Sequence, residues 1–261
     1  MHRIYCPSKN ISGDKITLDD QQQVHHARDV LRLKVLEEAV IFDDSGNEYN
    51  STVEKLLPQS VIFKIKNKKN VMPKLWKVRV TIACAIPKAS HMDQVIDKLT
   101  QVGVDAIIPL ETERVIVKMH KDKKISRLER WKKIALNASQ QSQRNTLPIL
   151  EAITDIEKLL LNSKNFDLKL IPTLQADRMP LKEALSIIKP KNILVLIGPE
   201  GDFTSEEVNL AVKAGFVPIT LGESVLRVET AAVCVASFIK FYYDQPVGVQ
   251  GDPGDFKGAK G

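Results

Sequence analysis

The sequence predicts an α/β protein in which a β-rich N-terminal domain precedes a larger domain built on a mainly parallel sheet. Short runs of β-branched residues occur repeatedly within residues 1–70, and such runs favour strands. Beyond residue 75, strand patterns alternate with helical patterns, which is typical of a parallel sheet covered by helices. Residues 193–197 are all apolar, as expected of a central parallel strand that is buried on both faces.

The N-terminal domain, residues 1–70, is expected to contain one short helix and three strands. The helix is predicted at residues 21–32, and the strands are predicted at residues 39–42, 51–55 and 60–65. The sequence Asp-Asp-Ser-Gly-Asn between the first two strands is a turn signal. Residues 67–74 are polar, with a proline near the end, and predict a linker.

The second domain, residues 75–244, is expected to alternate strands with helices. Strands are predicted at residues 76–86, 106–110, 167–172, 193–197 and 216–221, and helices at residues 92–102, 126–138, 156–161, 204–214 and 230–243. Ser126 with Glu129, and Thr204 with Glu207, match the capping box that begins a helix. Gly103 is suited to ending a helix. The Gly-rich residues 245–261 predict a disordered tail.

Composition places the chain among globular proteins. Of its 261 residues, 43% are hydrophobic and 27% are charged, which excludes intrinsic disorder. No apolar stretch reaches the roughly 18 residues of a membrane helix, and residues 1–7 lack the apolar core of a secretion signal, so a cytoplasmic location is expected. Cys6, Cys84 and Cys234 form no CxxC pair, which predicts buried free thiols and no metal site.

Positive charge is concentrated in one segment. The chain carries a net charge of +6, but residues 118–144 alone hold nine basic and two acidic side chains. Clustered cations attract a polyanion by releasing its condensed counterions. A nucleic-acid surface and an ordinary solvated helix face both fit this pattern.

Two glycine-containing segments follow predicted strands and form the candidate ligand site. Residues 198–203 read Gly-Pro-Glu-Gly-Asp-Phe, and residues 221–231 read Leu-Gly-Glu-Ser-Val-Leu-Arg-Val-Glu-Thr-Ala. Ligands of open α/β sheets bind beyond the carboxyl ends of the strands, although ordinary strand–helix turns would fit each segment alone. The chain contains no Walker, GxGxxG or GxSxG motif, and its histidines match no catalytic pattern.

Several short segments spread over nearly the whole chain, taken in order, carry a family resemblance. The ordered set comprises Arg3-Ile4-Tyr5, Thr112-Glu113-Arg114, Arg130 to Ala135, Gln141 to Asn145, Gly198 to Gly201 and Leu226-Arg227 with Glu229-Thr230-Ala231. In this order they resemble the bacterial 16S ribosomal RNA uracil-N3 methyltransferases, members of the SPOUT class of S-adenosylmethionine-dependent enzymes.

The resemblance implies a fold and partners. It implies an N-terminal PUA-like β-barrel, a C-terminal SPOUT α/β domain with a trefoil knot, and S-adenosylmethionine as the cofactor, with no metal. It further implies 16S ribosomal RNA or the assembled small subunit as substrate, and a homodimer. The predicted helix at residues 230–243 is apolar on most faces, which suits packing against both a core and a partner subunit.

The resemblance also assigns roles to single residues. The implied cofactor-binding residues are Thr173, Leu174, Gly198, Pro199, Glu200, Gly201, Leu221, Gly222, Val225, Leu226, Arg227, Thr230 and Ala231. The implied catalytic residues are Arg144, Arg227 and Glu229. The implied RNA-binding residues are Arg3, Arg28, Arg32, Lys88, Arg114, Lys123, Lys124 and Lys132.

Three positions depart from the family pattern. Asp202 stands where the family usually has a glycine, and Gln101 and Gln140 stand where it usually has glutamates. These departures leave two alternatives open: a SPOUT methyltransferase with another RNA target, and a non-catalytic RNA-binding or ribosome assembly factor.

Overall fold

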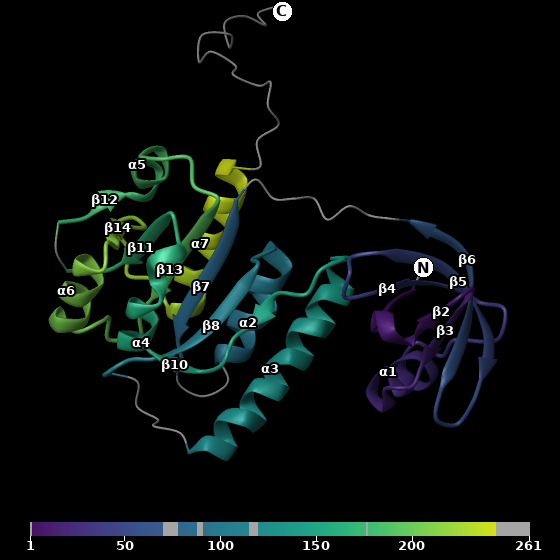
Figure 1. Cartoon of the computed structure of the whole chain (residues 1–261). Helices are drawn as coiled ribbons and strands as arrows, with labels where there is room; N and C mark the ends of the chain where they lie inside the picture. Colours follow the sequence, from purple (N-terminus) through teal and green to yellow (C-terminus); the bar gives the residue numbers. More distant parts are fainter. Residues whose placement is uncertain (1, 70–77, 88–90, 115–119, 176, 244–261) are drawn as a thin grey trace, which may run out of the picture.

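The computed structural model describes residues 2–69, 78–87, 91–114, 120–175 and 177–243, and it contains two sheets (Figure 1). The first sheet uses strands up to residue 69 and the second uses strands from residue 79 onward. The predicted α/β class is therefore confirmed. Lys88 and the predicted tail lie outside the described residues.

The N-terminal sheet has the strand order β1-β4-β5-β6-β3-β2. Its strands are β1 (His2–Tyr5), β2 (Ile11–Ser12), β3 (Lys15–Leu18), β4 (Glu38–Phe42), β5 (Glu48–Leu56) and β6 (Val61–Lys69). The sequence predicted β4, β5 and β6 but missed the three short strands before them. Strand β6 continues to Lys69 because residues 67–69 pair with β5, so the predicted linker began too early.

The predicted helix at residues 21–32 is shorter than expected and changes type. It consists of α1 (Gln21–His25), capped by the Asp20 carboxylate, followed by a π-helical turn at His26–Val30. Arg32 has a φ of +53°, and this left-handed conformation ends the helical path.

The C-terminal sheet is parallel throughout and has the order β10-β8-β7-β13-β11-β14-β12, with β9 paired to β8. Its strands are β7 (Arg79–Ala85), β8 (Ala106–Glu111), β9 (Ile149–Leu150), β10 (Thr154–Asp155), β11 (Leu168–Pro172), β12 (Met179–Pro180), β13 (Asn192–Ile197) and β14 (Val217–Thr220). Its helices are α2 (His91–Val102), α3 (Lys121–Gln141), α4 (Ile156–Leu161), α5 (Leu181–Ser186), α6 (Ser205–Lys213) and α7 (Val228–Tyr243). The short elements β9, β10, β12 and α5 were not predicted.

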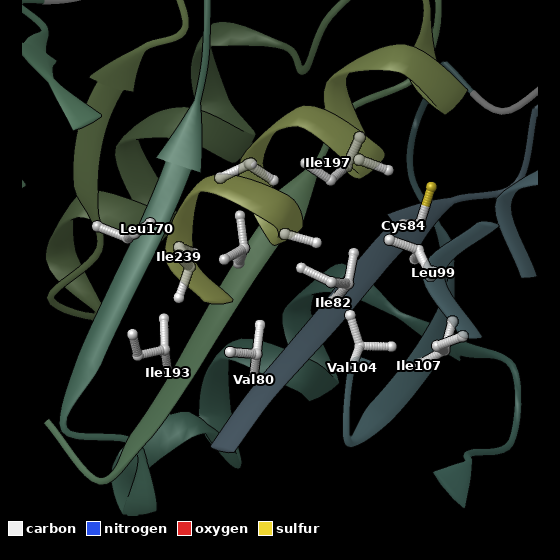
Figure 2. Close-up of a cluster of buried hydrophobic side chains, with 14 of the residues drawn as sticks. Val80, Ile82, Cys84, Leu99, Val104, Ile107, Leu170, Ile193, Ile197 and Ile239 are labelled. Atoms are coloured by element: carbon white, nitrogen blue, oxygen red, sulfur yellow. The ribbon is translucent and has the colours of Figure 1, made fainter. Parts of the chain in front are cut away.

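Helices cover both faces of this sheet, as predicted for strand β13. Ile193, Val195 and Ile197 of β13 join a core that includes side chains of α2, α5 and α7, whereas Leu194 and Leu196 join the opposite core with α4 and α6. Figure 2 shows β7 and β13 side chains of the first core packed beneath Ile239 of α7. Residues 193–197 of β13 are therefore buried on both faces of the sheet, which explains why all of them are apolar.

Two other predictions were wrong. Helix α3 begins at Lys121 after His120, so Ser126 and Glu129 lie inside the helix and form no capping box. Residues 121–125, three of which are lysines, favour a helix enough to extend it by more than a turn before Ser126. Cys234 is exposed, although Cys6 and Cys84 are buried, because α7 turns only one face toward the core. The predicted Thr204–Glu207 capping box of α6 is confirmed.

The two domains contact each other through the C-terminal end of α3. The side-chain amide of Gln140 donates to Oε1 of Gln23 at 2.8 Å in a buried position, and the Arg3 guanidinium donates to Oδ1 of Asn145. Figure 1 shows α3 running from the lower end of the C-terminal sheet to the N-terminal domain. No helix in the described part of the chain combines the length and apolarity needed to cross a membrane.

Candidate functional site

A pocket opens at the carboxyl ends of three adjacent strands, β13, β11 and β14. Each strand is followed by a loop that forms one wall, and residues from the first turns of α7 complete the lining. The lining residues are Pro172, Thr173, Leu174, Arg178, Ile197, Gly198, Pro199, Glu200, Asp202, Ile219, Thr220, Leu221, Gly222, Ser224, Val225, Leu226, Val228 and Ala231. This is the place where open α/β sheets bind their ligands.

The pocket encloses about 630 Å³, including space open to solvent, which is within the range of small-molecule sites. Leu221, Val225 and Leu226 give it an apolar wall. Carboxylates at Glu200 and Asp202 lie on the opposite loop. The pocket can therefore hold a ligand with a flat apolar part and a positive charge.

Most of the residues predicted for cofactor binding line this one pocket. The predicted residues that line it are Thr173, Leu174, Gly198, Pro199, Glu200, Leu221, Gly222, Val225, Leu226 and Ala231; Gly201, Arg227 and Thr230 are adjacent in sequence but are not part of the lining. The sequence reasoning missed Arg178, Thr220 and Ser224, among others. Their positions at a strand end or within six residues beyond it were the available signal.

Two glycines have steric or conformational reasons to be glycine. A Cβ atom at Gly198 would lie 3.1 Å from the Phe203 ring, and Phe203 is completely buried. Gly222 has a φ of +119°, a conformation that side chains rarely adopt. Both pocket loops therefore depend on the glycines that the sequence singled out.

Asp202 connects two of the pocket loops. Its Oδ2 atom accepts hydrogen bonds from the Thr173 hydroxyl at 3.0 Å and from the Leu174 amide at 2.8 Å. Its Oδ1 atom accepts a bond from the Phe203 amide at 2.8 Å. The loop after β13 is thus tied directly to the loop after β11.

Two of the three catalytic candidates lie beside the pocket. Arg227 is exposed between two lining residues, Leu226 and Val228. Glu229, in the first turn of α7, lies with Oε1 3.6 Å from Nδ1 of His91 at the start of α2. The sequence did not single out His91, because the histidines of the chain match no catalytic pattern.

The third candidate, Arg144, is engaged elsewhere within the chain. Its guanidinium donates to the carbonyl of Thr100 at 2.6 Å and to the carbonyl of Val104 at 3.1 Å. These carbonyls flank the end of α2, so Arg144 stabilises that helix terminus. Burial lowers the pKa of Arg144, and the nearby Asp105 carboxylate partly opposes this.

Two of the three N-terminal arginines predicted to bind RNA, Arg3 and Arg28, make contacts within the protein. Arg3 is paired with Glu48 and stacks over the Phe42 ring. Arg28 donates to the Pro58 carbonyl at 2.8 Å. Arg32 follows the π-helical turn, and Arg114 donates to the carbonyl of Gly201 at the pocket loop.

Helix α3 carries most of the described part of the cationic segment. Lys124 is paired with Glu111 at 2.6 Å and Lys132 with Glu129 at 2.8 Å. Lys121, Lys123 and Lys133 are exposed and form no ion pair within the described residues. The unpaired lysines give α3 its available positive charge.

Known proteins resemble the chain in both domains. Residues 74–240 match the family described as RNA methyltransferase domain, and residues 18–66 match the RNA methyltransferase PUA domain. The chain is 38% identical over 184 residues to the ribosomal RNA small subunit methyltransferase E of Mesomycoplasma hyopneumoniae, covering 69% of this chain and 76% of that protein. It is 28% identical over 244 residues to the protein of the same name from Bacillus subtilis, covering 90% and 91%.

Solved structures agree with the sequence matches. A methyltransferase from Legionella pneumophila, in complex with S-adenosylmethionine, superimposes with a TM-score of 0.85 at 30% identity, covering 92% of this chain and 97% of that one. The ribosomal RNA small subunit methyltransferase E of Neisseria gonorrhoeae, bound to S-adenosylmethionine, gives 0.80 at 29%, covering 94% and 100%. With the family match spanning more than half of its residues, the chain belongs to the RNA methyltransferase family that includes the ribosomal RNA small subunit methyltransferases E.

Proposed function

We propose that this protein transfers the methyl group of S-adenosylmethionine to N3 of a uridine in 16S ribosomal RNA. The observation that carries the proposal is the pocket at the ends of β13, β11 and β14, because it is lined by ten of the residues that the resemblance assigns to the cofactor. Two structural neighbours with 29–30% identity hold S-adenosylmethionine. The curated relatives are named for the small-subunit RNA.

The pocket is suited to this cofactor by its chemistry. Leu221, Val225 and Leu226 offer apolar surfaces for the faces of an adenine, and backbone groups of the same loop can read its edge. The cofactor, when bound, supplies an electrophilic methyl group on a positively charged sulfur. Glu200 places negative charge on the loop after β13, which favours a cation.

The acceptor atom requires two kinds of help from the protein. N3 of uracil carries a proton and becomes a good nucleophile only when the proton leaves. Arg227 is the proposed group that stabilises the negative charge developing on the ring, because a guanidinium stays ionised and donates several hydrogen bonds. Glu229 is the candidate proton acceptor, and its Oε1 lies 3.6 Å from Nδ1 of His91.

Arg144 remains a proposed catalytic residue on the resemblance alone. Its bonds to the Thr100 and Val104 carbonyls give it a second role in holding the end of α2. The helix-end role predicts a loss of stability when Arg144 is replaced, whereas the catalytic role predicts a loss of methylation.

RNA docking and dimer formation complete the proposal. The exposed lysines of α3 are the proposed phosphate contacts, which position an RNA without reading its sequence. Thr230, Cys234 and Phe238 recur every four residues on the exposed face of α7. This mostly apolar stripe supports a homodimer in which α7 packs against a partner subunit.

Nucleoside mass spectrometry of 16S ribosomal RNA, from cells with and without the gene, tests the reaction. Loss of 3-methyluridine on deletion and its return with the purified protein are expected. Unchanged 3-methyluridine would contradict the proposed product, and loss of another methylated nucleoside would indicate another RNA target. Calorimetry tests the cofactor: no S-adenosylmethionine binding at millimolar concentration would favour a non-catalytic assembly factor.

The family departures at Gln140 and Gln101 do not favour the non-catalytic alternative. Gln140 pairs with the amide of Gln23 between the domains, and Gln101 donates to Asp97 within α2 at 2.9 Å. Both amides have local hydrogen-bond partners outside the pocket. Their replacement of carboxylates therefore has a structural explanation that leaves the proposed chemistry intact.

A further inference from the structure

We infer that Asp202 is a positioning residue that holds the two cofactor-binding loops in their binding geometry. The inference rests on the proposed function, because it assigns the pocket to S-adenosylmethionine. Asp202 stands where the resembling family usually has a glycine, so its side chain adds contacts that a glycine would lack. It acts through the protein backbone and not through the reacting atoms.

The contacts of Asp202 converge from three donors. Thr173, which is 5% exposed, and Leu174 both donate to one carboxylate oxygen, at 3.0 and 2.8 Å. The Phe203 amide donates to the other oxygen at 2.8 Å. Thr173 and Leu174 line the pocket from the loop after β11, whereas Asp202 lines it from the loop after β13. One side chain therefore fixes the separation of two pocket walls.

The backbone conformation of Asp202 also indicates that its side chain has a role. Its φ is +60°, a conformation that glycine adopts without cost and that aspartate adopts more readily than most residues. A glycine would be conformationally easier here. The three hydrogen bonds offset the backbone cost, and they are available only to a side chain with acceptor oxygens.

A second residue ties the same two loops together. The Gln175 amide donates to the Phe203 carbonyl at 2.7 Å, and its oxygen accepts a bond from the Ser205 hydroxyl at 2.8 Å. Asp202 and Gln175 therefore link the loops from opposite directions. Gln175 bonds to Phe203 and Ser205, whereas Asp202 bonds to Thr173 and Leu174 at the pocket wall.

A positioning role and a direct charge effect give different ligand selectivity. S-adenosylmethionine carries a positive sulfur, whereas S-adenosylhomocysteine has the same adenosine and amino-acid parts with a neutral sulfur. Displaced loops weaken the binding of both ligands equally. A carboxylate that attracted the sulfonium would affect only the charged ligand.

The experiment measures the dissociation constants of both ligands, by calorimetry, for the wild type, Asp202→Gly and Asp202→Asn. Asp202→Gly is expected to weaken both ligands about tenfold, the factor typical of one lost hydrogen bond to a charged group. Asp202→Asn keeps an oxygen for Thr173 and Leu174 but not for Phe203, so a smaller, equal loss is expected. Glu223→Gln, which removes an exposed charge beside the pocket without any described hydrogen bond, is the control and should change either constant less than twofold.

Hydrogen exchange of the Leu174 amide tests the geometry without a ligand. Exchange should be faster in both Asp202 variants than in the wild type and in Glu223→Gln. Three results in Asp202→Gly would each overturn the inference: an unchanged exchange rate of the Leu174 amide, unchanged affinity for both ligands, or weaker binding of S-adenosylmethionine alone. A wild-type protein that bound neither ligand would instead contradict the proposed function, and the exchange result would still decide whether Asp202 holds the loop.

Discussion

The Lys240 ammonium group lies 2.8 Å from Oδ2 of Asp105 and joins the last turns of α7 to the residue before β8. Lys240 is 5% exposed, which is unusual for a lysine. The same carboxylate oxygen accepts a hydrogen bond from the Val80 amide at the start of β7. Three segments of the C-terminal domain therefore meet at one ion pair, whose lysine is buried and whose aspartate is partly exposed.

Substitution of Lys240 by methionine is expected to destabilise the protein. The change leaves the Asp105 carboxylate without its cation, and because that carboxylate is partly exposed and keeps the Val80 amide as a donor, the expected cost is about 2 kcal/mol. Urea unfolding measures the loss. The exposed Lys213 of α6, changed to methionine, should leave the free energy of unfolding within about 0.5 kcal/mol; equal effects at both positions would contradict the role of the pair.

Substitution of Arg144 by alanine separates its two proposed roles. Loss of the bonds to the Thr100 and Val104 carbonyls should lower the free energy of unfolding by about 2 kcal/mol. As a catalytic residue, Arg144 is also expected to be required for methylation, with S-adenosylmethionine affinity nearly unchanged. Turnover at the wild-type level by the folded variant would remove Arg144 from the active site and leave only the helix-end role.

RNA binding is expected to weaken steeply with salt, and unpaired lysines should contribute most of that dependence. Lys123→Gln should reduce the slope of log affinity against log salt by about 1. Lys124→Gln should reduce it less, because Lys124 is already paired with Glu111. Lys213→Gln serves as the control, and filter binding at several salt concentrations gives the slopes. A flat salt response of the wild type would exclude the α3 surface.

Light scattering should find a dimer, and Phe238→Lys should yield monomers. A charge placed on the exposed face of α7 cannot be buried against a partner without a large cost. Iodoacetamide should then label Cys234 faster in the variant, while Cys6 and Cys84 stay protected because they are buried. Leu210→Lys on α6, at another exposed apolar position, should remain dimeric. A wild type that is monomeric at all concentrations contradicts the α7 interface.

Stability should fall in alkaline solution partly through Cys6. Burial, with smaller contributions from Asp19 and Asp43, raises the pKa of Cys6 from 9.0 to about 12. The Cys6 thiol therefore loses its proton at a lower pH in the unfolded chain than in the folded protein. Its contribution to the free energy of unfolding is fully present below pH 9 and is lost as the pH rises toward 12. Cys6→Ala should flatten the decline of the unfolding free energy between pH 9 and 11. An unchanged slope would show that other groups, such as Tyr49, account for it.

Elements with a strong apolar pattern could be predicted from the sequence. Helix α4 and strand β13 fell within one residue of their predicted bounds, because apolar spacing determines which side chains are buried. The two-residue strands β2 and β9 could not be found, since such strands are defined by their partners and not by their own composition. The knot implied by the resemblance stays a prediction.

The candidate site shows the same division. The glycines and apolar residues after β13 and β14 were predictable from their place after strands. The Asp202–Thr173 bond and the engagement of Arg144 were not, because each joins residues 29 or more positions apart through side-chain orientation. A sequence motif identifies what a loop contains, whereas the structure decides which atoms remain available to a ligand.

Helix α3 sets the distance between the pocket edge of the C-terminal sheet and the N-terminal domain. Its first turns are paired with Glu111 at the carboxyl end of β8, on the pocket edge of the sheet, and its last turn contacts Gln23 of the N-terminal domain. At 21 residues it measures about 30 Å from end to end. Under the proposed function, a helix of this length sets the distance between an RNA contact on the N-terminal domain and the pocket, and thereby limits which nucleotides can reach the cofactor.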